Sequence, residues 1–126
     1  MKIYLIGSLL FLFQHISCSL SAQVYTSGGK LEERIQTQLD ELTGILTLSE
    51  EQKQLLKDIL LKYGQLAQDK RNELGEAPRD SVRAVLMGLD SLKNEEVKAI
   101  LTESQFADYL KFIEEQRLQR RERFRR

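Results

Sequence analysis

Apolar residues recur at every third or fourth position along most of this chain, and this spacing restricts its fold more than any other feature of the sequence. The pattern starts with five residues that would share one face of a helix: Leu31, Ile35, Leu39, Leu42 and Leu46. No alternation of apolar and polar residues lasts long enough to indicate a β-strand. The sequence therefore predicts an all-α fold.

Start and stop signals divide the pattern into four long helices with short connections. The second keeps a heptad spacing of apolar residues, as in a coiled coil, and Gly75 is expected to end it. Within the third, Asn94 could instead cap a separate short helix. The expected helices run from Leu31 to between Gly44 and Thr47, from after Ser49 to Gly75, from Pro78 as first helical residue to Ile100, and from after Thr102 to beyond Ile113.

Helices of this length in the 104 residues from position 23 onward form a thin layer rather than a globule. Part of their apolar surface would stay uncovered, so a homodimer or a binding groove is expected. The residues expected in the core include Leu56, Leu60, Leu86, Leu89 and Ile113.

The first 22 residues have the features of a secretory signal peptide. Lys2 precedes an apolar stretch over residues 3–13, which is too short to cross a membrane as a helix. Cleavage is expected after Ala22 or after Ser21. Two alternatives remain: an uncleaved N-terminal anchor, and a lipid anchor on Cys18. The sequence thus predicts an exported protein.

Removal of residues 1–22 leaves 104 residues and takes away the chain's single cysteine and single histidine. The mature chain can then form no disulfide and can use no thiolate or imidazole chemistry. It also contains no nucleophile–base pattern and no glycine-rich phosphate loop. Its remaining carboxylates suit Ca²⁺ or Mg²⁺ better than zinc or copper. We therefore expect no enzymatic activity, no cofactor and no tight transition-metal binding. Export also argues against a nucleic-acid partner.

The balanced charge of the chain, with 19 basic and 19 acidic residues, hides an uneven distribution. Residues 23–116, divided into a flexible leader at 23–30 and a helical domain at 31–116, carry 12 basic and 18 acidic residues, a net charge of −6. The tail at 117–126 carries six arginines and one glutamate, a net charge of +5. It is interpreted either as a solvated helix end or as an electrostatic contact surface. The candidate contact residues are Phe112, Arg117, Arg120, Arg121 and Phe124.

Two nearly identical strings precede the second and fourth helices. In each, a hydroxyl residue is expected to accept a hydrogen bond from the backbone N–H three residues later, and the glutamine at that position to reach back to the cap N–H. The leucine in front covers the apolar underside. The motif residues are Leu48, Ser49 and Gln52 in the first copy and Leu101, Thr102 and Gln105 in the second.

This repeated motif resembles the Leu-Thr-x-x-Gln signature of the Spy/CpxP family of Gram-negative periplasmic proteins. The copy at Leu101 matches in full, and the copy at Leu48 has serine for threonine. The signal-peptide end also looks like those of Bacteroidetes-type bacteria. The resemblance, over roughly residues 42–120, implies four long helices in an open, cradle-like arrangement of hairpins, usually homodimeric. Known members are ATP-independent chaperones, regulators of an envelope-stress sensor, or metal-responsive proteins.

Two functional hypotheses follow. The first is a holdase-type chaperone of the envelope stress response that binds unfolded or misfolded envelope proteins. The second is a regulatory partner or inhibitor of an envelope-stress sensor or another membrane signalling protein.

Overall fold

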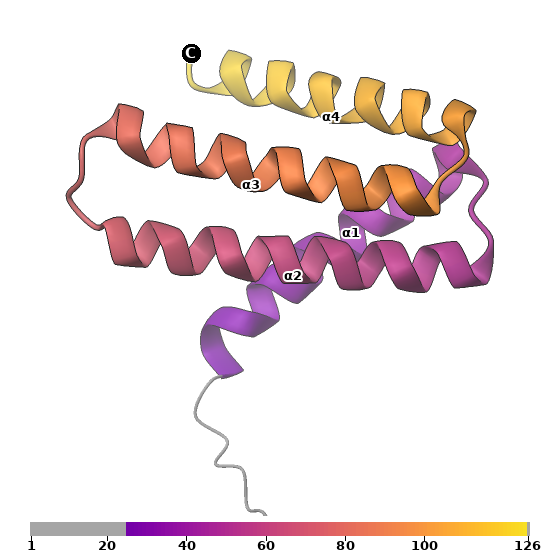
Figure 1. Cartoon of the computed structure of the whole chain (residues 1–126), viewed down its shortest axis with the longest axis horizontal. Coiled ribbons are helices and arrows are strands. Elements are labelled where there is room, and N and C mark those ends of the chain that lie inside the picture. The colour runs from indigo at the N-terminus through magenta and orange to yellow at the C-terminus, as the bar shows by residue number, and fades with distance from the viewer. Residues whose placement is uncertain (1–24, 126) are drawn as a thin grey trace, which may run out of the picture.

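The computed structural model of the chain describes residues 25–125, with side chains from residue 29 onward, and contains four helices and no strand in that range (Figure 1). The predicted signal peptide, Cys18 and Arg126 lie outside the described residues. The all-α prediction and the number of helices are confirmed. The helices are α1 (Tyr25–Leu46), α2 (Glu50–Leu74), α3 (Arg79–Ile100) and α4 (Glu103–Arg123).

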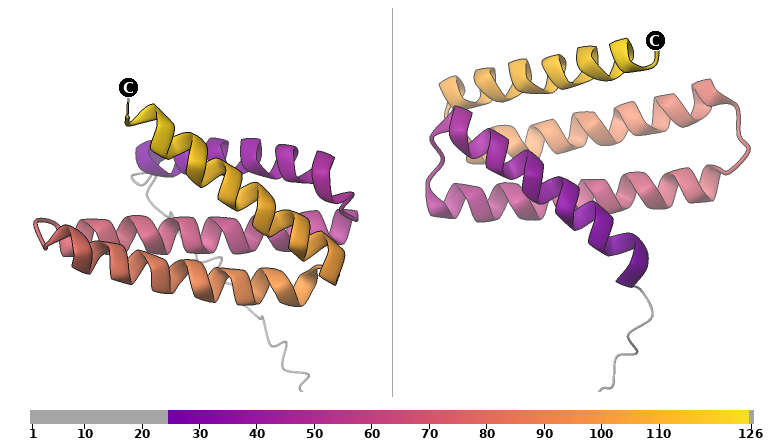
Figure 2. Two further views of the ribbon diagram at one scale, coloured as in Figure 1. Left: turned by 90° about the horizontal axis from the view of Figure 1, so that it is seen from above. Right: turned by 180° about the vertical axis from the view of Figure 1, so that it is seen from behind.

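The α2–α3 hairpin is the most extensively packed pair, and α1 packs across α2 (Figure 1). The α1–α2 and α3–α4 connections lie at the same end of the molecule. From this shared end α1 and α4 diverge, as the view from behind in Figure 2 shows. Of the helix pairs that contact each other, α3 and α4 are the least extensively packed. The four helices are therefore close together at the shared end, whereas α1 and α4 stand apart at the end where the α2–α3 turn lies (Figure 2). This agrees with the predicted open arrangement of hairpins.

Local signals set most helix boundaries where the sequence predicts them. Ser49 and Thr102 adopt extended backbone and cap α2 and α4. Gly75 ends α2 with φ of +44°, a conformation that side chains disfavour. Pro78 differs from the prediction: it is the N-cap of α3, and Arg79 is the first helical residue. α3 continues unbroken through Asn94, so no separate short helix forms there.

Two further predicted boundaries differ from the structure. The segment 23–30, expected to be a flexible leader, is helical from Tyr25 onward, including Gly28 and Gly29. Each glycine disfavours helix by only about 1 kcal/mol, and adding a turn to an existing helix avoids the unfavourable nucleation step. At the other end, the tail at 117–126 does not begin a new segment, because α4 continues to Arg123.

The core lies near the shared end, where the largest fully buried side chains are Leu42, Leu56, Val97 and Tyr109. Leu56 and Leu60 are buried as expected, whereas Leu86, Leu89 and Ile113 are only half-buried. On α4 the buried residues are Tyr109 and Phe112, which lie three positions apart on one helix face. Ile113 lies about 100° around the helix from Phe112, at the border of that face, and packs against the core while half-buried.

No helix among residues 25–125 combines the length and the apolar character needed to cross a membrane.

Candidate functional site

Both repeated motifs form complete capping boxes. At the start of α2, Gln52 N donates to Ser49 Oγ at 3.1 Å, and Ser49 N donates to Gln52 Oε1 at 3.0 Å. At the start of α4, Gln105 N donates to Thr102 Oγ1 at 3.2 Å, and Thr102 N donates to Gln105 Oε1 at 3.0 Å. The leucines in front, Leu48 and Leu101, are buried in the core.

The two glutamines also bind each other, which local sequence reasoning did not predict. Gln52 Nε2 donates to Gln105 Oε1 at 2.9 Å and to the Ile100 carbonyl at 3.1 Å. Gln105 Nε2 donates to the Leu46 carbonyl at 3.2 Å and to Gln52 Oε1 at 3.3 Å. We call this pair the glutamine clasp. It joins the α1–α2 connection to the α3–α4 connection, and it uses both donors and both acceptor positions of each amide.

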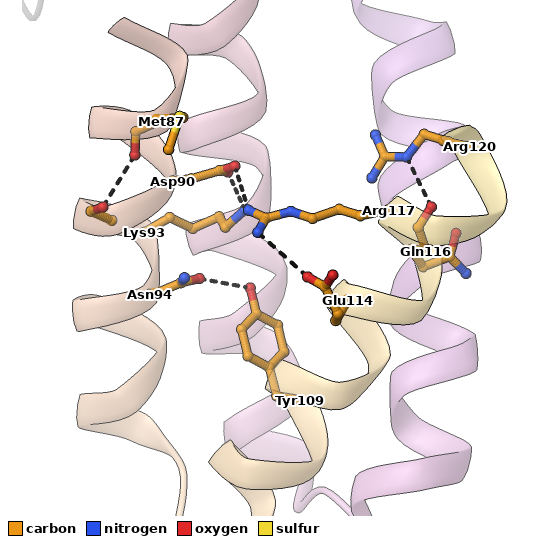
Figure 3. A network of polar contacts seen from close by, with 10 residues as sticks. Met87, Asp90, Lys93, Asn94, Tyr109, Glu114, Gln116, Arg117 and Arg120 are labelled. Atoms are coloured by element: carbon orange, nitrogen blue, oxygen red, sulfur yellow. Dashed lines mark hydrogen bonds and ion pairs between the residues drawn. The ribbon is translucent and has the colours of Figure 1, made fainter. Parts of the chain in front are cut away.

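A second polar network joins α3 to α4 farther from the clasp (Figure 3). Asp90 forms ion pairs with Lys93 at 2.8 Å and with Arg117 at 3.1 Å. Burial opposes ionisation of Asp90, but hydrogen bonds and charge from these two cations outweigh it and hold the Asp90 pKa below its usual value. Arg117 therefore docks α4 onto α3.

Below this network, the Tyr109 hydroxyl donates to Asn94 Oδ1 at 3.5 Å (Figure 3). Burial, with a smaller contribution from the Asp90 charge, raises the Tyr109 pKa far above its usual value. Tyr109 is therefore a neutral core residue, and it has no acid–base role near neutral pH.

A third polar contact links α2 to α3. The Glu96 carboxylate accepts from Lys62 Nζ at 2.5 Å and from the Tyr63 hydroxyl at 2.8 Å. These hydrogen bonds lower the pKa of Glu96 and raise that of Tyr63. Glu96 thus joins α2 to α3 through two hydrogen bonds.

All four helices line a cavity of about 620 Å³ at the open end of the molecule. We call it the basic cavity. Its apolar wall consists mainly of half-buried and buried side chains: Leu31, Ile35, Leu60, Tyr63, Leu86 and Ile113. Six cations line it against a single carboxylate, that of Asp90: Lys30, Arg34, Arg71, Lys93, Arg117 and Arg120.

The predicted contact residues do not share one surface. Arg117 and Arg120 line the basic cavity, whereas Arg121 and Phe124 do not, and the Phe124 side chain is 90% exposed. Phe112 was expected to contact a partner, and this prediction is wrong: it is buried in the core, with 6% of its surface exposed. It shares the inward face of α4 with Tyr109, so a partner cannot reach it in this fold.

Large apolar side chains nevertheless remain exposed on every helix. On α3, Val85 and Leu92 lie seven residues apart on one face, and Met87 is also exposed. On α2, Leu55 and Leu66 lie eleven residues apart, again on one face. Nine such side chains are exposed among the described residues: Ile45, Leu55, Leu66, Val85, Met87, Leu92, Leu110, Leu118 and Phe124.

In the part of the chain that the structure describes, no three His, Cys, Asp or Glu side chains form a group able to hold a metal ion. Searches against protein-family models, curated proteins and solved structures found no match.

Proposed function

We propose that this protein is an exported, ATP-independent chaperone that holds unfolding envelope proteins in the manner of the Spy/CpxP family. The observation that carries the proposal is the set of nine large exposed apolar side chains, distributed over all four helices of a small open fold. Single exposed apolar side chains are ordinary on a protein surface, but several of these share a helix face, as Val85 and Leu92 do on α3, and grouped apolar surface is typical of binding sites. Family membership, as implied by the two capping motifs, is part of the proposal.

Charge beside the apolar surface suits weak and reversible binding. The body at 23–116 has a net charge of −6 and the end at 117–126 has a net charge of +5. Charged groups around apolar residues keep the protein soluble and steer encounters with clients of either sign. A holdase of this kind needs no nucleotide site.

The proposal is tested by aggregation of an unrelated unfolding protein, followed by light scattering without ATP at a near-stoichiometric ratio. The expected result is suppression that weakens in Met87→Ser/Leu92→Ser, because these substitutions remove exposed apolar surface without opening the core. The control Asn72→Ser/Gln119→Ser changes two exposed polar residues and should behave like the parent protein. Absence of suppression by the parent protein contradicts the chaperone proposal.

A regulatory role is the second candidate, and the Arg-rich end of α4 favours it. Arg121, Arg123 and Arg125 are exposed and form no ion pair among the described residues, so they can bind an acidic domain of a membrane sensor. Specific capture of one membrane regulator by the intact protein, together with failure to suppress aggregation, would favour this role over the first.

Export to the periplasm and homodimerisation belong to the same proposal. The mature N-terminus should be Gln23 or Ala22, and intact-mass spectrometry of the protein recovered from cells measures it directly. A diacylglyceryl group on Cys18 would instead show a lipoprotein. A second copy would cover part of the exposed apolar surface, and sedimentation at several concentrations measures that association.

A further inference from the structure

We propose that the basic cavity is a binding site for a single-chain anionic amphiphile, with a fatty-acid carboxylate as its ligand class. This site is separate from the proposed chaperone activity, because it is a half-open cavity that would take a small molecule. The cavity volume of about 620 Å³ lies within the range of small-molecule sites, which is about 300–1,000 Å³. Residues 60–71 of α2 line its length, which corresponds to about 17 Å of helix.

The charge of the cavity lining calls for an anionic ligand. Asp90 is already paired with Lys93 and Arg117. The other four lining cations form no ion pair within the described residues: Lys30, Arg34, Arg71 and Arg120. They come from three different helices and lie exposed at the cavity edge. A carboxylate bound among them would gain charge-assisted hydrogen bonds, and arginine is well suited to bidentate carboxylate contacts.

The apolar wall calls for a hydrocarbon chain. Ile35, Leu60 and Tyr63 are buried, and Leu31, Leu86 and Ile113 are half-buried beside them. Gly64 lets the Leu31 side chain pack closely on α2, because a Cβ atom there would approach Leu31 Cδ1 to 2.9 Å. Each methylene group that leaves water for such a wall contributes about 0.8 kcal/mol.

An acidic peptide fits the charge but not the wall. Most of its backbone N–H and C=O groups would lose water without gaining partners, because the uncharged amides of the lining are few, Gln38 and Gln68, and the Tyr63 hydroxyl is bound to Glu96. An amphiphile has its polar atoms at one end and can place them among the exposed cations at the cavity edge. The geometry therefore favours the amphiphile.

Isothermal titration of the protein with dodecanoate below its critical micelle concentration tests the site. We expect saturable binding of one molecule. Arg34→Glu/Arg71→Glu should weaken the affinity about tenfold or more, because it removes charge-assisted hydrogen bonds to the carboxylate. The matched control Arg79→Glu/Arg83→Glu makes the same change in charge on exposed residues outside the cavity and should leave binding within about twofold. Equal weakening in both variants, or no saturable binding, overturns the proposal.

Three further measurements use the parent protein, so they identify the ligand whether or not the variants fold. In the parent protein, dodecanoate should shift the amide resonances of Gly64 and Ala67, which line the cavity, more than those of Gly44. Dodecanol should bind at least about tenfold more weakly, because it lacks the charge. Anionic phosphatidylglycerol vesicles or an oligoglutamate peptide that bound while dodecanoate did not would overturn the proposal in favour of a membrane surface or an acidic peptide. Aggregation assays do not enter these outcomes, so the chaperone proposal and this one can fail separately.

Discussion

At the scale of single residues, the glutamine clasp explains why both motifs carry glutamine where a capping box would accept glutamate equally well. Gln105→Glu keeps the acceptor for the Thr102 N–H but loses both donors and places a charge beside the Leu46 carbonyl and Gln52 Oε1. We expect a loss of about 2–3 kcal/mol in the free energy of unfolding, measured in urea. The exposed control Gln119→Glu should stay within about 0.5 kcal/mol. Equal values for the two variants would show that the clasp contributes nothing.

The Asp90 pair gives a dependence on pH. The pKa of Asp90 is lowered in the folded state, so its contribution to stability is present above the unfolded value of about 3.9 and is lost as pH falls through that value and below. Asp90→Asn should cost at most about 1 kcal/mol near pH 7, because both partners are 43% exposed, and nothing near pH 2. Unfolding midpoints in urea across this pH range measure the difference. Asp69→Asn, at an exposed position with no cation contact, is the control; a pH-independent loss in Asp90→Asn argues against the ion pair.

The capping boxes could be predicted from the sequence, because a box depends on residues three positions apart. The clasp could not, because Gln52 and Gln105 are 53 positions apart and their contact depends on how two hairpins pack. The error at Phe112 has a similar cause. Phe112 and Ile113 are both apolar, and the orientation of α4 against α1 and α3 decides which of them is buried.

At the scale of the helices, two glycines should respond to alanine in opposite directions. Gly88 lies inside α3 with open space around it, so Gly88→Ala should raise the free energy of unfolding by about 0.5–1 kcal/mol. Gly75 ends α2 at positive φ, so Gly75→Ala should lower it by about 1–2 kcal/mol. Thermal and urea unfolding of the pair measure both changes. If the two variants shift stability in the same direction, the assigned roles of these glycines are wrong.

The helices themselves were predictable because local signals mark several of their boundaries. Ser49, Gly75, Pro78 and Thr102 determine where helices begin and end, with an error of one residue at Pro78. The start of α1 has no such signal, and two glycines pointed the wrong way. Glycine propensity is a weak preference that neighbouring helix and tertiary packing override.

At the scale of the whole molecule, the chain consists of two similar hairpins. The caps Ser49 and Thr102 are 53 positions apart, and the same shift nearly superimposes the range of α1 on that of α3. The clasp is the point where the two hairpins exchange equivalent hydrogen bonds. The symmetry is incomplete, because α2 packs closely on α3 while α1 and α4 diverge. The basic cavity is a consequence of that divergence, and it could not be inferred from the sequence, since its cations come from residues 30 to 120.

The separation of charge over the molecule leads to a test in which the fold and the cavity stay intact. Arg121→Gln/Arg123→Gln/Arg125→Gln lowers the charge of the tail from +5 to +2 and retains the cavity residues Arg117 and Arg120. Binding of an acidic client or sensor domain should weaken several-fold at low salt, and the difference should vanish near 0.5 M salt, because exposed charges are then screened. Fluorescence anisotropy of the labelled partner against salt measures this. The control Lys57→Gln/Lys98→Gln/Lys111→Gln removes the same charge from the acidic body and should have a smaller effect. Unchanged binding by the tail variant at low salt would mean that the tail is only a solvated end of α4.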